Sequence, residues 1–312
     1  MRQLAALMLS VIILGVIYWR IDLRELLRVF QHVQLGWLAL SLAVIGPLMV
    51  LSAWRLRYLV PRGVTLRLGD ATRLVFTAST LNMVLPSKMG DLAKAYFLTG
   101  PGRLTGSLAF SLVVFEKACD VLALLLWCLI GLISSPHPTW VRAMTVPVAL
   151  MLLGGLLLMS APRLTGWCVT VARLMLPARA SAPLERLQQS WEELHDSFRR
   201  RPLRLLLMAA MSVALWFLHL VQIWWLLPAL NVHAPLGAHL ALASLSILVG
   251  LLPLTIAGIG TRDSALIVLY QPFFAAPIAA ALGLFCTLRY VIPALIGLPF
   301  LPRFLSSPHV VS

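Results

Sequence analysis

Charged side chains are scarce in this sequence. Asp, Glu, Lys and Arg together make up 12% of the 312 residues, whereas 60% are hydrophobic. A soluble domain is typically about a quarter charged and about half apolar, so this chain has too little polar surface to cover a water-soluble fold. The mean hydropathy of +0.92 agrees. The shortage of charge excludes a soluble catalytic domain and predicts a protein that works within a lipid bilayer.

Cysteine is also rare, and the sequence lacks the patterns that indicate a cysteine-based site, a β-barrel or a hydrolytic active site. The four cysteines are Cys119, Cys128, Cys168 and Cys286. None of them form a close pair, and all fall in predicted helices, so neither a zinc site nor a disulfide framework is indicated. Alternation with a period of two residues is absent, which argues against an outer-membrane barrel. The sequence has no Asp-x-Asp metal motif and no nucleophile–histidine constellation. We therefore expect no cofactor, and a membrane-embedded enzyme acting on a lipid carrier is the weaker alternative.

Long apolar blocks are what the sequence does contain. A membrane-spanning helix needs about 20 mostly apolar residues, and six blocks qualify as full spans: 4–19, 35–60, 105–133, 142–160, 203–230 and 276–302. The first block ends at Tyr18-Trp19-Arg20 without a small-x-small cleavage site, so we interpret it as a retained helix and not as a signal peptide. The predicted fold is all-α, a polytopic helix bundle forming one integral membrane domain over residues 1–312.

Two further apolar segments are interrupted in the middle. Residues 68–100 contain Pro86 and Gly90, and residues 236–274 contain Pro253 and two glycines. Such segments are typical of broken or re-entrant helical hairpins, whose unwound backbone must be buried in protein or line a wet cavity. Charge counts are equally consistent with two full crossings for each segment. We expect the glycines at the tips, Gly90, Gly258 and Gly260, to leave backbone amides free.

The two interrupted segments share one order of residues. Each has a proline, then glycine, then an acidic residue, followed by a fresh apolar helix. This order predicts an inverted repeat, the usual architecture of a carrier with a site near the middle of the membrane. The alternative is that both segments merely share the general features of helix breaks.

The net charge of +14 comes from arginines between the apolar blocks, which argues against a nucleic-acid partner. The predicted loop from Arg55 to Arg73 holds five arginines and that from Pro162 to Arg204 holds eight, whereas 134–141 and 231–239 hold none. The positive-inside rule then predicts a multi-pass protein of the cell inner membrane with both termini cytoplasmic; only the three arginines of 20–34 disagree. Within the loop at about 162–203, apolar residues at helical spacing predict an amphipathic helix on the cytoplasmic interface.

Several charged residues fall where lipid is expected. Glu116 and Asp120 share one helix face within an apolar block, and Arg289 lies midway along the last span. Each would cost about 2.5–3.5 kcal/mol at the centre of a lipid-facing helix, so each must face protein or water. One interpretation is a structural network in which Arg289 or Lys117 pairs with these carboxylates. The other is a polar pathway for a headgroup, an ion or a proton.

The buried or hairpin-associated charges have a slight cationic excess. Five are basic and four are acidic: Lys88, Lys94, Lys117, Arg262 and Arg289 against Asp91, Glu116, Asp120 and Asp263. An excess of one positive charge beside helix N-termini suits an anionic group such as a lipid phosphate. His219 and Gln222, three residues apart, are expected to make interhelical hydrogen bonds.

Three sequence blocks carry a family resemblance. They are Asn82 to Asp91 (NMVLPSKMGD), Phe115 to Asp120 (FEKACD) and Pro253 to Asp263 (PLTIAGIGTRD). Together they resemble the signature blocks of the lysylphosphatidylglycerol synthase transmembrane, or flippase-like, family, and the resemblance covers about residues 5–300. Asp91 and Asp263 stand where the family pattern leads us to expect glutamate, and Lys117 where arginine is usual, which alters the side-chain geometry available to a ligand.

The resemblance implies lipid translocation. Family members joined to an aminoacyltransferase domain make and flip lysylphosphatidylglycerol, but this chain ends at Ser312 without such a domain. Stand-alone members are associated with glycolipid or hopanoid pathways, so the resemblance leaves the substrate open.

We therefore predict a transporter, not an enzyme: a flippase for an anionic lipid or a lipid-linked substrate, whose headgroup passes through a polar interior. The alternative from another class is a scaffold or accessory subunit for a lipid- or glycan-modifying enzyme partner. The candidate substrate-binding residues are Asn82, Pro86, Lys88, Gly90, Asp91, Glu116, Asp120, Gly258, Gly260, Arg262, Asp263 and Arg289.

Overall fold

The computed structural model describes most of the chain: residues 23–61, 66–85, 90–99, 104–136, 138–161, 202–252, 255 and 257–302, with isolated positions elsewhere. Within these ranges the chain is helical, and the β-type pairing is an isolated bridge between Thr99 and Leu104. The predicted span at 4–19 and the predicted amphipathic helix of the 162–203 loop lie outside the described residues, apart from single positions.

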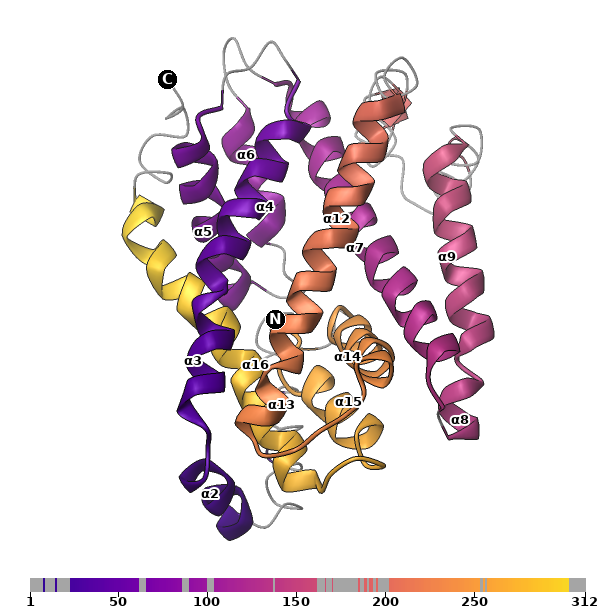
Figure 1. Ribbon diagram of the computed structural model, residues 1–312. Helices are drawn as coiled ribbons and strands as arrows, with labels where there is room; N and C mark the ends of the chain where they lie inside the picture. Colours follow the sequence, from indigo (N-terminus) through magenta and orange to yellow (C-terminus); the bar gives the residue numbers. More distant parts are fainter. Residues whose placement is uncertain are drawn as a thin grey trace.

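Four of the predicted spans are confirmed as helices long and apolar enough to cross a membrane: Leu35–Leu59, Thr139–Ser160, Pro202–Ala229 and Ala276–Phe300. They comprise α3 (Leu35–Ala43) with α4 (Ile45–Leu59), α8 (Thr139–Arg142) with α9 (Thr145–Ser160), α12 (Pro202–Trp224) with α13 (Leu226–Ala229), and α16 (Ala276–Gly297) with η2 (Leu298–Phe300). The predicted span 105–133 corresponds to α7 (Gly106–Ser134). A short helix, α2 (Leu23–Gln31), precedes α3. These helices form the bundle in Figure 1.

The first interrupted segment folds into a helical hairpin. It consists of α5 (Leu68–Val84) and α6 (Gly90–Leu98). Gly90 begins α6 against the backbone of α5: a Cβ added there would lie 2.6 Å from the carbonyl oxygen of Ala78. Leu66 and Leu104, which flank the hairpin, are buried in one apolar cluster. The hairpin therefore returns to the end of the bundle at which it starts, the upper end in Figure 1.

The second interrupted segment is also a hairpin, made of α14 (Leu236–Gly250) and α15 (Thr261–Leu269). At its tip the backbone has positive φ at Ala257, Gly258 and Gly260 (53°, 74° and 98°). At its base the Tyr270 hydroxyl lies 2.7 Å from His239 Nδ1, which joins the first turn of α14 to the residue that ends α15. This hairpin opens toward the lower end of Figure 1, opposite to the first.

Each hairpin packs against the long helix of the other half. α7 lies against α14, and α16 lies against α5. Glycines allow both close approaches: Gly131 of α7 meets the α14 backbone at Ala241, and Gly297 of α16 meets the α5 backbone at Phe76. Two hairpins that open to opposite ends and exchange partners in this way have the arrangement that an inverted repeat predicts.

One predicted boundary is wrong. The five-arginine loop from Arg55 to Arg73 is shorter than the sequence suggested, because α4 extends to Leu59 and α5 begins at Leu68. Arg55 is consequently a helix residue, and it is only 2% exposed. An arginine can occupy such a position because two carboxylates of α7, Glu116 and Asp120, compensate its charge.

Candidate functional site

A cavity of about 410 Å³ lies among the helices of the bundle. Its walls come from α4, α5, α6, α7, α12 and α16, and the tip of the second hairpin reaches it through Leu251 and Ala257. Seven of the described lining residues are charged: Arg55, Asp91, Lys94, Glu116, Lys117, Asp120 and Arg289. The two halves of the chain and both hairpin segments therefore meet at one cavity, in which charged side chains stand among apolar ones.

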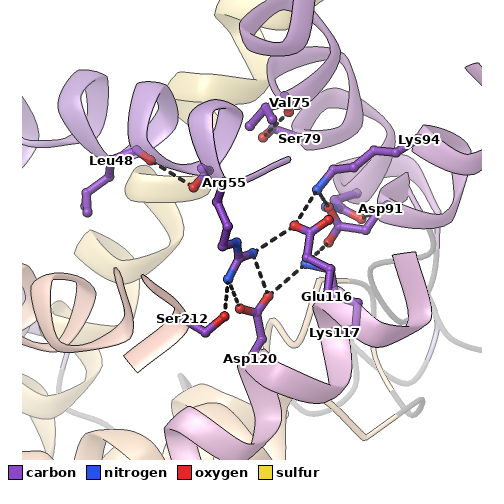
Figure 2. A network of polar contacts seen from close by, with 12 residues as sticks. Leu48, Arg55, Val75, Ser79, Asp91, Lys94, Glu116, Lys117, Asp120 and Ser212 are labelled. Atoms are coloured by element: carbon purple, nitrogen blue, oxygen red, sulfur yellow. Dashed lines mark hydrogen bonds and ion pairs between the residues drawn. The ribbon is translucent and has the colours of Figure 1, made fainter. Parts of the chain in front are cut away.

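Arg55 is the centre of the ionic network on one wall (Figure 2). From α4 its guanidinium donates to Glu116 Oε1 at 2.8 Å and to both carboxylate oxygens of Asp120 on α7. It also donates to the Ser212 hydroxyl of α12 at 3.0 Å. Glu116 and Asp120 can share this partner because they are four residues apart and lie on the same face of α7. One buried guanidinium thus connects three helices.

Two lysines complete the network. Lys94 of α6 lies 2.9 Å from Asp91 and 3.3 Å from Glu116. Lys117 of α7 lies 3.0 Å from Asp91 and 3.2 Å from Asp120. Asn82 holds the start of α6 in place, because its side-chain oxygen accepts from the Asp91 amide at 3.2 Å. The first hairpin is therefore attached to α7 through alternating charges.

Arg289 occupies a different wall and has neutral partners. Its Nε donates to Gln222 Oε1 at 2.8 Å, and its Nη2 lies 3.1 Å from His219 Nδ1. Gln222 is fixed in turn by Ser41, since each side chain bonds to the other's backbone carbonyl, at 2.7 and 2.8 Å. The predicted interhelical hydrogen bonds of His219 and Gln222 are confirmed, and α3, α12 and α16 are joined by them.

Comparison with known proteins identifies the family. The family model of the lysylphosphatidylglycerol synthase TM region matches residues 3–297. The chain belongs to this family. No curated protein matches the chain. Membership places it among the membrane domains of lysylphosphatidylglycerol synthase-like proteins, and two of the three family blocks, Asn82 to Asp91 and Phe115 to Asp120, contribute charged residues to the cavity wall.

The third block forms the tip of the second hairpin. Arg262 pairs with its neighbour Asp263 at 2.6 Å and donates to the Gly283 carbonyl and the Thr287 hydroxyl of α16, at 3.0 and 2.7 Å. Asp263 Oδ2 accepts from the Gly260 amide at 3.0 Å. The expectation of a free amide at Gly260 is therefore wrong: the carboxylate three residues later already caps it.

The structure brings together part of the predicted site. Asn82, Asp91, Glu116, Asp120 and Arg289 line the cavity. Gly90, Gly258, Gly260, Arg262 and Asp263 instead shape the two hairpins and are not among the described lining residues. Pro86 and Lys88 lie outside the described residues. Among the residues described, no group of His, Cys, Asp and Glu is arranged to hold a metal ion.

The predicted ion pairs are partly right. Lys117 does pair with Asp120, but in the described structure Arg289 contacts neither carboxylate of α7. Their main partner is Arg55, which sequence reasoning missed because it assigned Arg55 to a loop. A signal was present: Arg55 falls within the apolar block 35–60, where a lone arginine needs an acidic partner just as Glu116 and Asp120 need a basic one.

Proposed function

We propose that this protein is a carrier that moves the headgroup of an anionic lipid or lipid-linked substrate across the cell inner membrane, with both termini in the cytoplasm. One observation supports this above all: most of the buried charges of the described bundle, Arg262 and Asp263 excepted, line an open space. Ion pairs that serve structure alone are best enclosed by tight packing, because desolvated charges need every available partner. Here the charged residues line a cavity of about 410 Å³, a volume within the range of about 300–1,000 Å³ typical of ligand sites.

The position of the cavity suits alternate exposure. Residues of both hairpin segments line it, and the two hairpins open to opposite ends of the bundle (Figure 1). Such hairpins can move against the long helices in turn, so that a headgroup held among them faces one side and then the other. The acyl chains would stay in lipid while the polar headgroup crosses through the cavity.

The test is to fill the cavity without disturbing its ion pairs. Ser79 of α5 lines the cavity, and its hydroxyl bonds to the Val75 carbonyl of its own helix at 3.0 Å. Ser79→Phe should occupy the space without removing any contact between helices that the described structure shows for this hydroxyl. We expect lipid flipping in proteoliposomes to fall at least severalfold, measured as the fraction of fluorescent headgroup-labelled lipid accessible to an external reductant, while the folded yield in detergent is kept.

Ser160→Phe is the matched control. Ser160, at the end of α9, is exposed and likewise bonds to a carbonyl of its own helix, that of Leu156. The control should flip lipid at the wild-type rate. Wild-type flipping by Ser79→Phe, or no flipping by the wild-type protein across a panel of anionic lipids, would exclude the cavity as a transport route.

A further inference from the structure

Two ion pairs join α6 to α7 across the cavity wall. Lys94 lies 3.3 Å from Glu116, and Asp91 lies 3.0 Å from Lys117. We call these four residues the α6–α7 seam, and all of them line the cavity. The exposed fraction of the side chain falls from 38% at Lys117 to 1% at Glu116. The seam therefore has one pair that water or a ligand can reach and one pair that is closed to both.

Every charge of the seam also has a partner on its own side. Within α6, Asp91 and Lys94 are three residues apart and 2.9 Å from each other. The two pairs on the α7 side are Glu116 with Arg55, at 2.8 Å, and Lys117 with Asp120, at 3.2 Å. If α6 and α7 moved apart, the two crossing pairs would break, but none of the four seam charges would be left without a partner.

Each side of the seam is also formally neutral by itself. The α6 side carries one acidic and one basic residue, Asp91 and Lys94. The side formed by α4 and α7 carries two of each: Glu116, Asp120, Arg55 and Lys117. Breaking a buried ion pair is most costly when it leaves a charge uncompensated. Opening the seam avoids that cost, because both sides keep equal numbers of positive and negative charges.

The neighbouring helix contacts are built differently. α6 meets α5 at Gly90, α16 meets α5 at Gly297, and α7 meets α14 at Gly131. In each case an added Cβ would lie 2.2–2.4 Å from a backbone atom of the facing helix. Separation at such places loses close-packed contacts outright, and no second partner replaces them. The seam therefore lies between two closely packed groups of helices, one containing α5, α6 and α16 and the other α7 and α14.

The base of α6 is held without ion pairs. Thr99, directly after α6, forms an isolated β-bridge with Leu104, which precedes α7. Phe97 and Leu98 of α6 are buried in one apolar cluster with Ala109 of α7. The ion pairs begin farther from this base, toward the start of α6. The base can therefore stay closed and act as a pivot while the seam separates.

We propose that the α6–α7 seam is the gate of the cavity, which opens by separation of the two crossing ion pairs about the apolar base. In the closed state, drawn in Figure 2, both crossing pairs are made. In the open state each seam charge keeps the partner on its own side, and the substrate headgroup enters between the two helices. The inference deepens the proposed function and rests on it, because it states how the carrier admits its substrate.

A double substitution tests the gate without leaving a charge unpaired. Asp91→Asn with Lys94→Gln removes both crossing pairs, whereas the α7 side keeps its own pairs. The matched control is Asp70→Asn with Arg73→Gln, which removes an acid and a base of the same spacing on α5, 3.3 Å apart. Both variants should keep the folded yield, and only the first should open the seam.

Spin labels measure the separation. Cysteines at Val84 of α5 and Leu157 of α9, both exposed, carry labels for double electron–electron resonance. This label pair spans the seam, because α5 packs against α6 and α9 against α7. A second label pair, at Gly69 of α5 and Leu284 of α16, stays within one group of helices. Cys168 is replaced by serine, and the other three cysteines are buried.

We expect two distance populations for the label pair that spans the seam. Their ratio of long to short distance should rise at least about tenfold in the Asp91 and Lys94 double variant, since losing a hydrogen bond to a charged group shifts an equilibrium by about that factor or more. The ratio should stay at the wild-type value in the control variant. An unchanged ratio in the double variant, or an equal change within one group of helices, would overturn the gate.

A reversible lock tests the gate in a protein that keeps its inner pair. Asp91→Cys with Lys117→Cys leaves Lys94 paired with Glu116 and Asp120 paired with Arg55. A bifunctional methanethiosulfonate reagent then links the two cysteines across the seam, and wild-type protein treated alike is the control.

Flipping in proteoliposomes should fall to the background rate when the link forms and return when a reductant removes it. This arm decides the question even if the double variant fails to fold. Flipping that continues in the linked protein would keep the carrier and reject the gate. A shifted distance ratio without any flipping by the wild type would keep the moving seam and reject the carrier.

Discussion

The two hairpins resemble each other in sequence and differ in how they are held. The first is attached by long-range ion pairs, since Lys94 of α6 contacts Glu116 of α7 and Asp91 of α6 contacts Lys117 of α7. The second confines its charges to a local pair, Arg262 with Asp263, and closes at its base through the neutral contact of Tyr270 with His239. The same order of proline, glycine and acid thus produces an ionic wall in one half and a largely self-contained turn in the other.

This difference also bears on the surroundings of Arg289. A wall whose cations and carboxylates are matched can stay buried without a ligand. The half that keeps its carboxylate within its own hairpin leaves Arg289 with neutral partners. The comparison indicates that the charges of the first hairpin are balanced against α7, whereas those of the second hairpin are balanced mainly within the hairpin itself.

The largest expected effect concerns the direction in which each hairpin opens, because the comparison requires the two hairpins to open to opposite sides of the membrane. Single cysteines at Arg67 and Thr105, both exposed and flanking the first hairpin, should be labelled from the cytoplasm by a membrane-impermeant maleimide. Cysteines at His233 and Gln271, exposed and flanking the second, should be labelled only from the opposite side. The effect is all or none. Labelling of position 105 from outside would mean that the first segment crosses the membrane and does not return.

The next largest effect should come from Arg55. Arg55→Gln removes the shared partner of Glu116 and Asp120 and leaves two buried carboxylates short of cations. Breaking a buried ion pair typically costs about 3–5 kcal/mol, a large part of the stability of a domain. We expect the folded yield in detergent to collapse.

Arg262→Gln is the comparison variant for the second half. It removes the cationic partner of one carboxylate, that of Asp263, which still accepts a hydrogen bond from the Gly260 amide. A clear loss of yield smaller than that of Arg55→Gln is expected, as measured by monodisperse protein recovered at equal expression. Equal losses would show that the two halves depend on their charges to the same degree.

The hairpin tips should respond less strongly. At Gly258, φ is +74° and an added Cβ would lie 2.5 Å from the Gly250 carbonyl oxygen, so Gly258→Ala is both strained and crowded. Crowding of this kind costs about 1–3 kcal/mol. Gly90→Ala should lie in the same range, because the added Cβ meets the α5 backbone. Unfolding in denaturant gives the values.

Gly69→Ala controls for the substitution itself, because nothing lies within 4 Å of an added Cβ there. Its stability should stay within about 1 kcal/mol of the wild type. A loss at Gly69 comparable to that at the tips would remove the case for close backbone packing.

The sequence predicts the architecture because its signals are strong and local. Apolar blocks of the right length became spans, and the breaks at Gly90 and Gly258 became hairpin tips. The membrane forbids unpaired backbone in contact with lipid, so few alternatives to helices remain. The same reasoning found Glu116, Asp120 and Arg289, because any charge within an apolar block stands out.

What the sequence does not predict is which charges meet. Arg55 and Asp120 are 65 residues apart, and their contact depends on how α4 crosses α7. The spacing of residues along one helix does not predict where another helix crosses it. The same limit explains why Arg262 and Asp263, although within a family block, lie outside the described cavity lining: adjacent charges can satisfy each other locally, and only the packing of α15 against α16 shows that they do.

The smallest effect expected sharpens the comparison at the base of the second hairpin. Tyr270→Phe removes the hydroxyl that contacts His239 Nδ1 but keeps the ring, which is fully buried and stacks on Phe274 at a centroid distance of 5.1 Å. His239 Nε2 retains the Leu220 carbonyl at 3.0 Å. One neutral hydrogen bond is lost, so we expect a decrease of about 1 kcal/mol in unfolding free energy. Because the contact joins the two ends of one hairpin, hydrogen exchange should accelerate in α15 and stay unchanged in α6. Equal acceleration in both helices would mean that the hairpins open together, and the division into an ionic half and a self-contained half would fail.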